Sequence, residues 1–217
     1  MGRIRFVTGT DTGVGKTVLA AALAVQSVAD GAATCYFKPV QTGLQPREPG
    51  DADFVASVAA GCRAEEGVRF AAPLAPAVAA AVAGEKVDAE ALRLRALDLA
   101  RECDTLIVEG AGGLLVLLSD AVDMADFASG LDAELVVATR PTLGTLNHTA
   151  LTVEAARRRG LDPALVVCNW PAEPALTETT NLEQLKEMAP VIGVIPAIDG
   201  LDVESGGAPA TPVIVPA

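Results

Sequence analysis

The stretch Ile4–Thr17, IRFVTGTDTGVGKT, joins a short apolar run to a glycine-rich loop. The loop leads into residues 16–30, which are rich in Ala and Leu and have helical periodicity. Glycines let such a loop curl with its N–H groups pointing inward, and the following helix adds partial positive charge. We therefore expect a phosphate-binding site, although Thr10 stands where the usual spacing, G-x-x-x-x-G-K-S/T, requires glycine.

The last residues of this loop carry side chains suited to a nucleotide. Lys16 would reach the outer phosphates, and Thr17 would offer its hydroxyl to Mg²⁺. The alternative, a glycine-rich turn followed by a chance Lys-Thr pair, does not account for the strand before the loop and the helix after it. A dinucleotide fingerprint fails on spacing, because Val18 and Leu115 stand where its third glycine would be.

Short apolar runs alternate with longer helical patterns along the rest of the chain. Near-continuous apolar strands separated by helices indicate a single α/β domain, 1–217, with a mostly parallel sheet covered by helices on both faces. Residues 200–217 are rich in Gly and Pro, so we expect an irregular tail. Besides 4–8 and 16–30, we expect strands at 34–38, 105–109, 135–138, 165–168 and 191–195, and helices at about 51–60, 85–101, 145–159 and 181–188.

The composition limits the partners and the location. The 16 basic and 28 acidic side chains give a net charge of −12, which argues against nucleic acid or an anionic membrane surface as the main partner. The first residues are too soon interrupted by charge for a signal peptide, and the Ala-rich run 71–83 contains two prolines. We expect a cytoplasmic protein whose four widely spaced cysteines are buried free thiols.

Carboxylates and a second lysine follow other predicted strands, at the edge where parallel sheets bind ligands. Glu109 ends an apolar strand and runs into a glycine-rich turn, the position of a metal-associated acid beside a phosphate. Asp51 and Asp53 are further candidates, although either could instead cap the helix that begins there. Lys38 ends the second strand, and its charge beside Lys16 and Mg²⁺ suggests phosphoryl transfer to an anionic acceptor.

Four motifs, in this order and spacing, closely resemble the dethiobiotin synthase family over about residues 4–196. They are GTDTGVGKT at 9–17, FKPVQTG at 37–43, VEGAGGLLV at 108–116 and LGTLNHT at 143–149. The resemblance implies a fold of the P-loop NTPase type, Mg²⁺ as cofactor, ATP as co-substrate, and a homodimer with its active site at the interface.

The resemblance also implies a reaction, the penultimate step of biotin biosynthesis. One amine of 7,8-diaminononanoate takes up CO₂ as a carbamate, whose oxygen attacks the γ-phosphate of ATP to give a carbamic–phosphoric anhydride. The second amine then closes the ring and expels phosphate. The products are dethiobiotin, ADP and phosphate.

Positions that match the family's motifs take roles from the resemblance. The expected catalytic residues are Lys38, Lys16 and Thr42. The expected metal ligands are Thr17, Asp53 and Glu109, with Asp53 a better match than Asp51. The substrate is expected to contact Thr12, Lys38, Thr42, Gly144, Leu146 and Asn147, the last three at a turn that receives its carboxylate from the neighbouring subunit. The expected nucleotide-binding residues are Thr12, Gly13, Val14, Gly15, Lys16, Thr17, Glu109, Gly112, Asn169 and Pro196.

The chain departs from the family at several positions. Members commonly carry glutamate where Gly13 stands. They often carry an acidic residue where Trp170 follows Asn169, which leaves nucleoside triphosphates other than ATP open. The lone His148 is not demanded by the mechanism, and we expect a structural role for it.

Two other functions are kept as alternatives. One is a nucleotide-switched partitioning ATPase of the ParA/MinD type, which typically has a further lysine early in the phosphate loop; residues 9–14 contain none. The other is an amidating synthetase of the cobyrinic acid type. That class usually needs a glutamine-hydrolysing domain, for which the 217 residues leave no room.

Overall fold

The computed structural model describes residues 1–201 and 211–216. The strands are β1 (Arg3–Gly9), β2 (Thr34–Thr42), β3 (Arg63–Phe70), β4 (Thr105–Glu109), β5 (Glu134–Thr139), β6 (Pro163–Trp170) and β7 (Val191–Pro196). The helices are α1 (Lys16–Ala29), α2 (Asp51–Val58), α3 (Pro76–Val82), α4 (Ala89–Glu102), α5 (Met124–Gly130), α6 (Thr145–Arg158) and α7 (Leu176–Met188).

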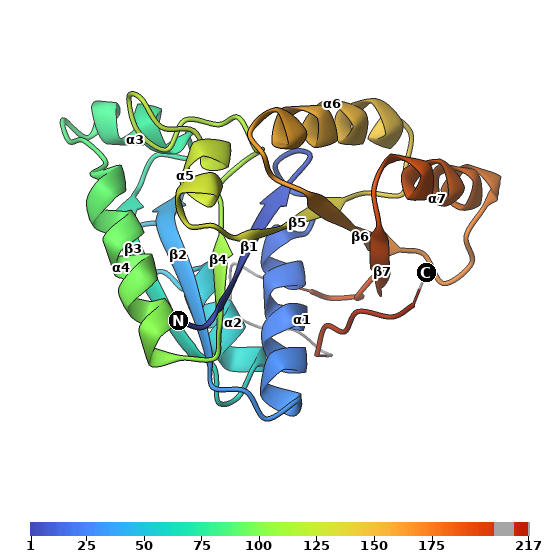
Figure 1. Cartoon of the computed structure of the whole chain (residues 1–217), viewed down its shortest axis with the longest axis horizontal. Helices are drawn as coiled ribbons and strands as arrows, with labels where there is room; N and C mark the ends of the chain where they lie inside the picture. The colour runs from blue at the N-terminus through green and yellow to red at the C-terminus, as the bar shows by residue number, and fades with distance from the viewer. Residues whose placement is uncertain (202–210, 217) are drawn as a thin grey trace.

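All seven strands form one sheet in the order β3-β2-β4-β1-β5-β6-β7, and every pairing between neighbours is parallel. Helices lie on both faces of this sheet (Figure 1). The expected α/β fold class is therefore confirmed, and every expected helix and strand is present, β4 with the expected ends and the others with shifted ends.

The most informative shift is in β2, which continues through Pro39 to Thr42 instead of ending at Lys38. Pairing of β2 with β4 ends at Phe37, so the missing N–H of Pro39 lies beyond that ladder and costs no bond there. The longer strand carries Thr42 to the edge of the sheet where β1 and β4 also end.

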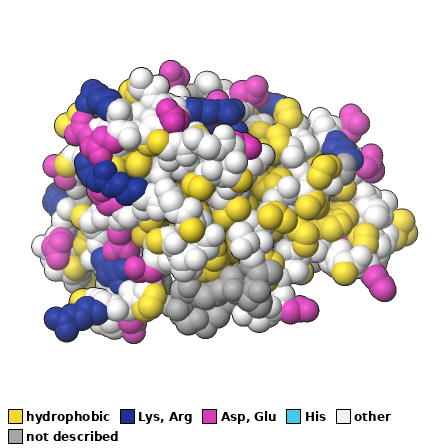
Figure 2. All heavy atoms as spheres, turned by 90° about the horizontal axis from the view of Figure 1, so that it is seen from below, with side chains coloured by type: hydrophobic (Ala, Val, Ile, Leu, Met, Phe, Trp, Pro, Cys, Tyr) yellow, Lys and Arg dark blue, Asp and Glu magenta, His cyan; other side chains and the backbone are white. Residues whose placement is uncertain are grey.

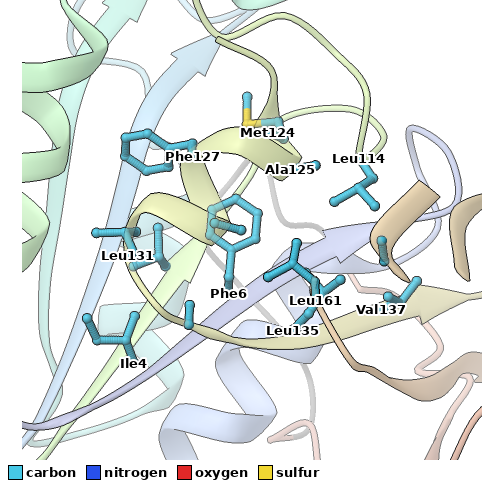
Figure 3. Packing of buried hydrophobic residues seen from close by; sticks show 14 of the residues in the cluster. Ile4, Phe6, Leu114, Met124, Ala125, Phe127, Leu131, Leu135, Val137 and Leu161 are labelled. Carbon is cyan, nitrogen blue, oxygen red and sulfur yellow. The ribbon is translucent and has the colours of Figure 1, made fainter. Parts of the chain in front are cut away.

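Each face of the sheet has its own apolar core. Leu19, Leu23 and Phe54 of α1 and α2 belong to one buried cluster, and residues of α3 to α7 belong to the other. In the second cluster Phe6 lies beneath Met124 and Phe127 (Figure 3), with the two phenyl rings 6.2 Å apart in an edge-to-face arrangement. These two layers hold the strands in register and fix where their carboxyl ends meet.

The surface differs between the two ends of the sheet. Seen from below, charged side chains crowd the side of α4 and β3, and hydrophobic ones gather toward the side of β7 and α7 (Figure 2). No helix of the described part of the chain has the length and apolar character needed to cross a membrane.

The described part of the tail is irregular apart from one antiparallel bridge, which joins Val215 to Val194 of β7. The rest of the predicted irregular tail, residues 202–210 and 217, lies outside the described residues.

Candidate active site

A cleft of about 510 Å³ opens at the carboxyl edge of the sheet, where β1, β2 and β4 end. Its walls come from the loop after β1, the ends of β2, β4 and β6, and the start of α2. The sequence-predicted residues that line it are Thr12, Gly13, Gly15, Lys16, Thr17, Lys38, Thr42, Glu109, Gly112 and Asn169. Most of the predicted nucleotide residues therefore meet at one place.

The loop between β1 and α1 is held in a curled shape by its glycines. Gly13 and Gly15 have φ angles of 71° and 101°, in the left-handed region that favours glycine. Lys16 Nζ donates across the loop to the Asp11 carbonyl at 3.0 Å. Val14 turns inward and is 1% exposed, so it anchors the loop in the core and does not line the cleft.

A buried ionic cluster forms the floor of the cleft. Lys38 Nζ lies 2.5 Å from Asp51 Oδ2 and 2.8 Å from Glu109 Oε1, and it also donates to the Gly110 carbonyl at 3.3 Å. Thr17 Oγ1 donates to the same Glu109 oxygen at 2.9 Å. Lys38 and Glu109 are 4% and 1% exposed, so water screens these charges little.

The pKa directions follow from burial and from these contacts. Burial lowers the pKa of Lys38, but Glu109 and Asp51 outweigh it, so the net pKa lies above the ordinary value and the lysine stays protonated. For Asp51, burial would raise the pKa, yet Lys38 brings it below its usual value. For Glu109, burial raises the pKa more than Lys38 lowers it. Burial also lowers the pKa of Lys16.

Tyr36 was not predicted as part of this cluster. Its side chain is fully buried, and its hydroxyl donates to Glu109 Oε2 at 2.8 Å. Burial and the neighbouring carboxylates raise the pKa of the phenol well above its usual value, so it remains a donor. The sequence could have placed Tyr36 near this cluster, because side chains alternate along a strand and Tyr36 therefore points to the same side of β2 as Lys38.

The loop that leads into α2 positions Asp51. Arg69 of β3 donates to the carbonyls of Gln45 and Glu48 at 3.1 and 2.6 Å, and its guanidinium also pairs with Glu66. The Asp51 N–H donates to Gln41 Oε1 at 3.2 Å. These bonds fix the amino end of α2 against β2 and turn the Asp51 carboxylate toward Lys38.

The predicted preference for Asp53 over Asp51 does not match this geometry. Asp53 is exposed, and its Oδ2 accepts the Gly50 N–H at 2.8 Å, which closes the first turn of α2. Asp51, in contrast, lines the cleft and lies next to Lys38. The geometry therefore favours Asp51 over Asp53 for the ligand role, and which aspartate binds the metal stays a prediction.

The oxygen atoms of Thr17, Asp51 and Glu109 converge where the Lys38 ammonium already balances negative charge. Hard oxygen donors of this kind suit Mg²⁺, which usually takes one or two carboxylates and completes its shell with phosphates and water. The described residues hold no group of three His, Cys or carboxylate side chains, as a dedicated all-protein metal cage would require. The donor set therefore fits a metal that arrives with a nucleotide.

The structure does not bring every predicted residue to the cleft. Gly144, Leu146 and Asn147 lie at the amino end of α6, outside the cleft lining, and Pro196 pairs with Trp170 at the edge of the sheet. His148 is exposed, so packing gives no support to the structural role expected for it.

Comparisons with known proteins identify the family of this chain. The AAA domain family matches residues 3–205. Two relatives are named ATP-dependent dethiobiotin synthetase BioD. The one from Streptomyces coelicolor is 44% identical over 88% of this chain and 82% of its own length. The one from Frankia casuarinae is 46% identical over 90% of this chain and 84% of its own length.

Solved structures show the same fold at much lower identity. The cell division ATPase MinD of Pyrococcus furiosus is similar with a TM-score of 0.58 and 18% identity, over 91% of this chain and 84% of that one. At this identity the likeness concerns the fold alone, and it lends the partitioning ATPase alternative no more than distant support. Because its relatives match at more than 40% identity over most of their length, the chain belongs to the family of ATP-dependent dethiobiotin synthetases.

Proposed function

We propose that this protein is an ATP-dependent cyclo-ligase that converts 7,8-diaminononanoate, CO₂ and ATP into dethiobiotin, ADP and phosphate. The names of its relatives support this proposal. The observation that carries it is the buried Lys38, a second cation that faces the same cleft as the phosphate-loop Lys16. Binding a nucleotide alone requires one such lysine, whereas transfer to an anionic acceptor assembles more negative charge.

The nucleotide would bind along the loop from Thr12 to Thr17. The backbone N–H groups and Lys16 would hold the phosphates at the amino end of α1, and Asn169 would lie near the base. We propose Thr17, Asp51 and Glu109 as the Mg²⁺ ligands, with Asp51 in place of Asp53. When bound, Mg²⁺ neutralises negative charge on the transferring phosphoryl group.

The acceptor would lie beside Lys38, Thr42 and Thr12, which share the cleft with the phosphate loop. A carbamate formed from one amine and CO₂ attacks the γ-phosphorus, the bond to the ADP oxygen breaks, and a carbamic–phosphoric anhydride results. The second amine then attacks the carbamate carbon and expels phosphate. Lys38 would stabilise the negative charge on the carbamate and on the phosphoryl oxygens, because it stays protonated.

The far end of the substrate would bind another copy of the chain. We propose a cytoplasmic homodimer in which Gly144, Leu146 and Asn147 of the neighbouring subunit receive the substrate carboxylate. Gly144 is the N-cap of α6 and no side chain caps this helix end, whose partial positive charge would suit a carboxylate.

The test is direct. The purified protein should be incubated with diaminononanoate, bicarbonate, Mg²⁺ and ATP, and dethiobiotin should be sought by mass spectrometry. Formation of dethiobiotin together with diamine-dependent phosphate release would support the proposal. Phosphate release at the same rate without the diamine, from folded protein, would refute it and favour a nucleotide-switched ATPase.

A further inference from the structure

The sole tyrosine of the chain, Tyr36, makes its only side-chain hydrogen bond in the described structure to a residue of the candidate metal site. Tyr36 pairs in register with Ile107 of β4, and Glu109 lies two residues further along that strand on the same face. Two residues of strand correspond to about 6.6 Å, a distance that a phenol side chain spans. The alternation of the two strands thus directs the hydroxyl to the Glu109 carboxylate.

The two oxygens of Glu109 have different partners. Oε1 accepts from Thr17 and Lys38, both of which line the cleft, at 2.9 and 2.8 Å. Oε2 accepts from Tyr36 at 2.8 Å, and Tyr36 is absent from the cleft lining. One oxygen therefore faces the cleft, and the other is held inside the protein.

We propose that Tyr36 is a positioning residue of the Mg²⁺–nucleotide site, which holds the Glu109 carboxylate with Oε1 turned toward the cleft. The inference rests on the proposed function only in taking Glu109 as a metal ligand. Outer partners of metal-ligating groups fix their orientation, and their loss typically lowers metal affinity about 10- to 100-fold.

A phenylalanine would fill the same apolar space, so packing does not explain the hydroxyl. The ring belongs to the buried apolar cluster that also contains residues of α1 and α2. Without the hydroxyl, Glu109 Oε2 would have no hydrogen-bond donor in the described structure. Both Glu109 and Tyr36 are buried, so water would not easily replace the lost donor. The carboxylate would then be free to rotate toward its remaining donors, Thr17 and Lys38.

Tyr36→Phe tests the proposal by titrating Mg²⁺ at a fixed ADP concentration and following binding by calorimetry. We expect the Mg²⁺ concentration at half-saturation to rise about 10-fold, with ADP affinity in EDTA unchanged. The control is Thr34→Val, which removes a buried hydroxyl from the other end of β2, where Thr34 bonds Ser27 at 2.7 Å. Equal Mg²⁺ dependence in both variants and the parent would overturn the proposal.

A second measurement needs no variant. Because Tyr36 is the only tyrosine, adding Mg²⁺ to the ADP-saturated parent should change the ultraviolet absorption of one identifiable phenol. Neither measurement requires diaminononanoate or turnover, so a positive result would stand even if dethiobiotin did not form.

Discussion

Replacing Lys38 with methionine removes the positive charge but keeps most of the side-chain volume. In the parent, the ammonium is the one cation within hydrogen-bond distance of both Asp51 and Glu109 among the described residues. Loss of one partner from a buried ion pair costs about 3–5 kcal/mol, because the remaining charge is left without compensation. For a chain of this size that corresponds to roughly 6–20 °C in melting temperature.

The loss of folding stability in Lys38→Met should depend on pH, and the pKa shifts of the carboxyl groups predict its direction. In the parent, the lowered pKa of Asp51 contributes stability above its ordinary value of 3.8, and this is lost as the pH falls through the folded pKa. In the variant, burial without the lysine raises both carboxyl pKa values, so stability falls as the pH rises through about 4 and above. The two proteins should therefore approach equal stability in acid and differ fully at neutral pH.

Thermal and urea unfolding in EDTA, from acid to neutral pH, would measure this difference. Mg²⁺ with ADP should restore part of the lost stability but not turnover, because Lys38 is also assigned to the carbamate. Lys86→Met is a matched control, since among the described residues its 85% exposed side chain pairs only with Asp120 and should contribute within about 0.5 kcal/mol. A Lys38→Met variant as stable as the parent at neutral pH would refute the account of the cluster.

Other residues of the cleft can be tested singly. Asp51→Asn should raise the Mg²⁺ needed for nucleotide binding about 10-fold, and Asp53→Asn should not, since an amide oxygen still caps α2; calorimetry showing the reverse would return the metal role to Asp53. Gly15→Ala should abolish nucleotide binding in a fluorescence titration, because a Cβ there would lie 2.9 Å from that of Cys168; tight binding would contradict this. Since Trp170 replaces an acidic residue, CTP and GTP should replace ATP at similar rates, and a strong ATP preference would disprove it.

The sequence predicts the elements whose pattern is local. The strands β1, β4 and β5 are nearly continuous apolar runs; β4 has the predicted ends, and β1 and β5 extend one residue further at each end. The charged strand β3, RAEEGVRF, was missed because edge pairing and ion pairs stabilise it, including Arg95–Glu65 at 2.6 Å from α4. Such partners lie far away in the sequence, and strand propensity does not reveal them. The short helices α3 and α5 were also missed.

The choice between Asp51 and Asp53 could not be made from the local sequence, for a different reason. Residues two apart on a helix point to nearly opposite sides, so one aspartate of the pair had to face the cleft and the other solvent. Which one does depends on how α2 is rotated against β2, and contacts of Arg69 and Gln41 with the preceding loop set that rotation. Neither contact belongs to a local sequence pattern.

The arrangement of charge in the cleft explains how a chain with a net charge of −12 can bind a nucleotide. Lys38 and Lys16 balance Asp51 and Glu109, so the buried cluster is close to neutral before any ligand binds. A nucleotide without Mg²⁺ would meet the two carboxylates, and Mg²⁺ without a nucleotide would have to compete with Lys38 for the same oxygens. Bound together, they add charges of opposite sign, so Mg²⁺ offsets part of the negative charge that the nucleotide brings beside Asp51 and Glu109. The geometry therefore favours joint binding of metal and nucleotide over binding of either alone.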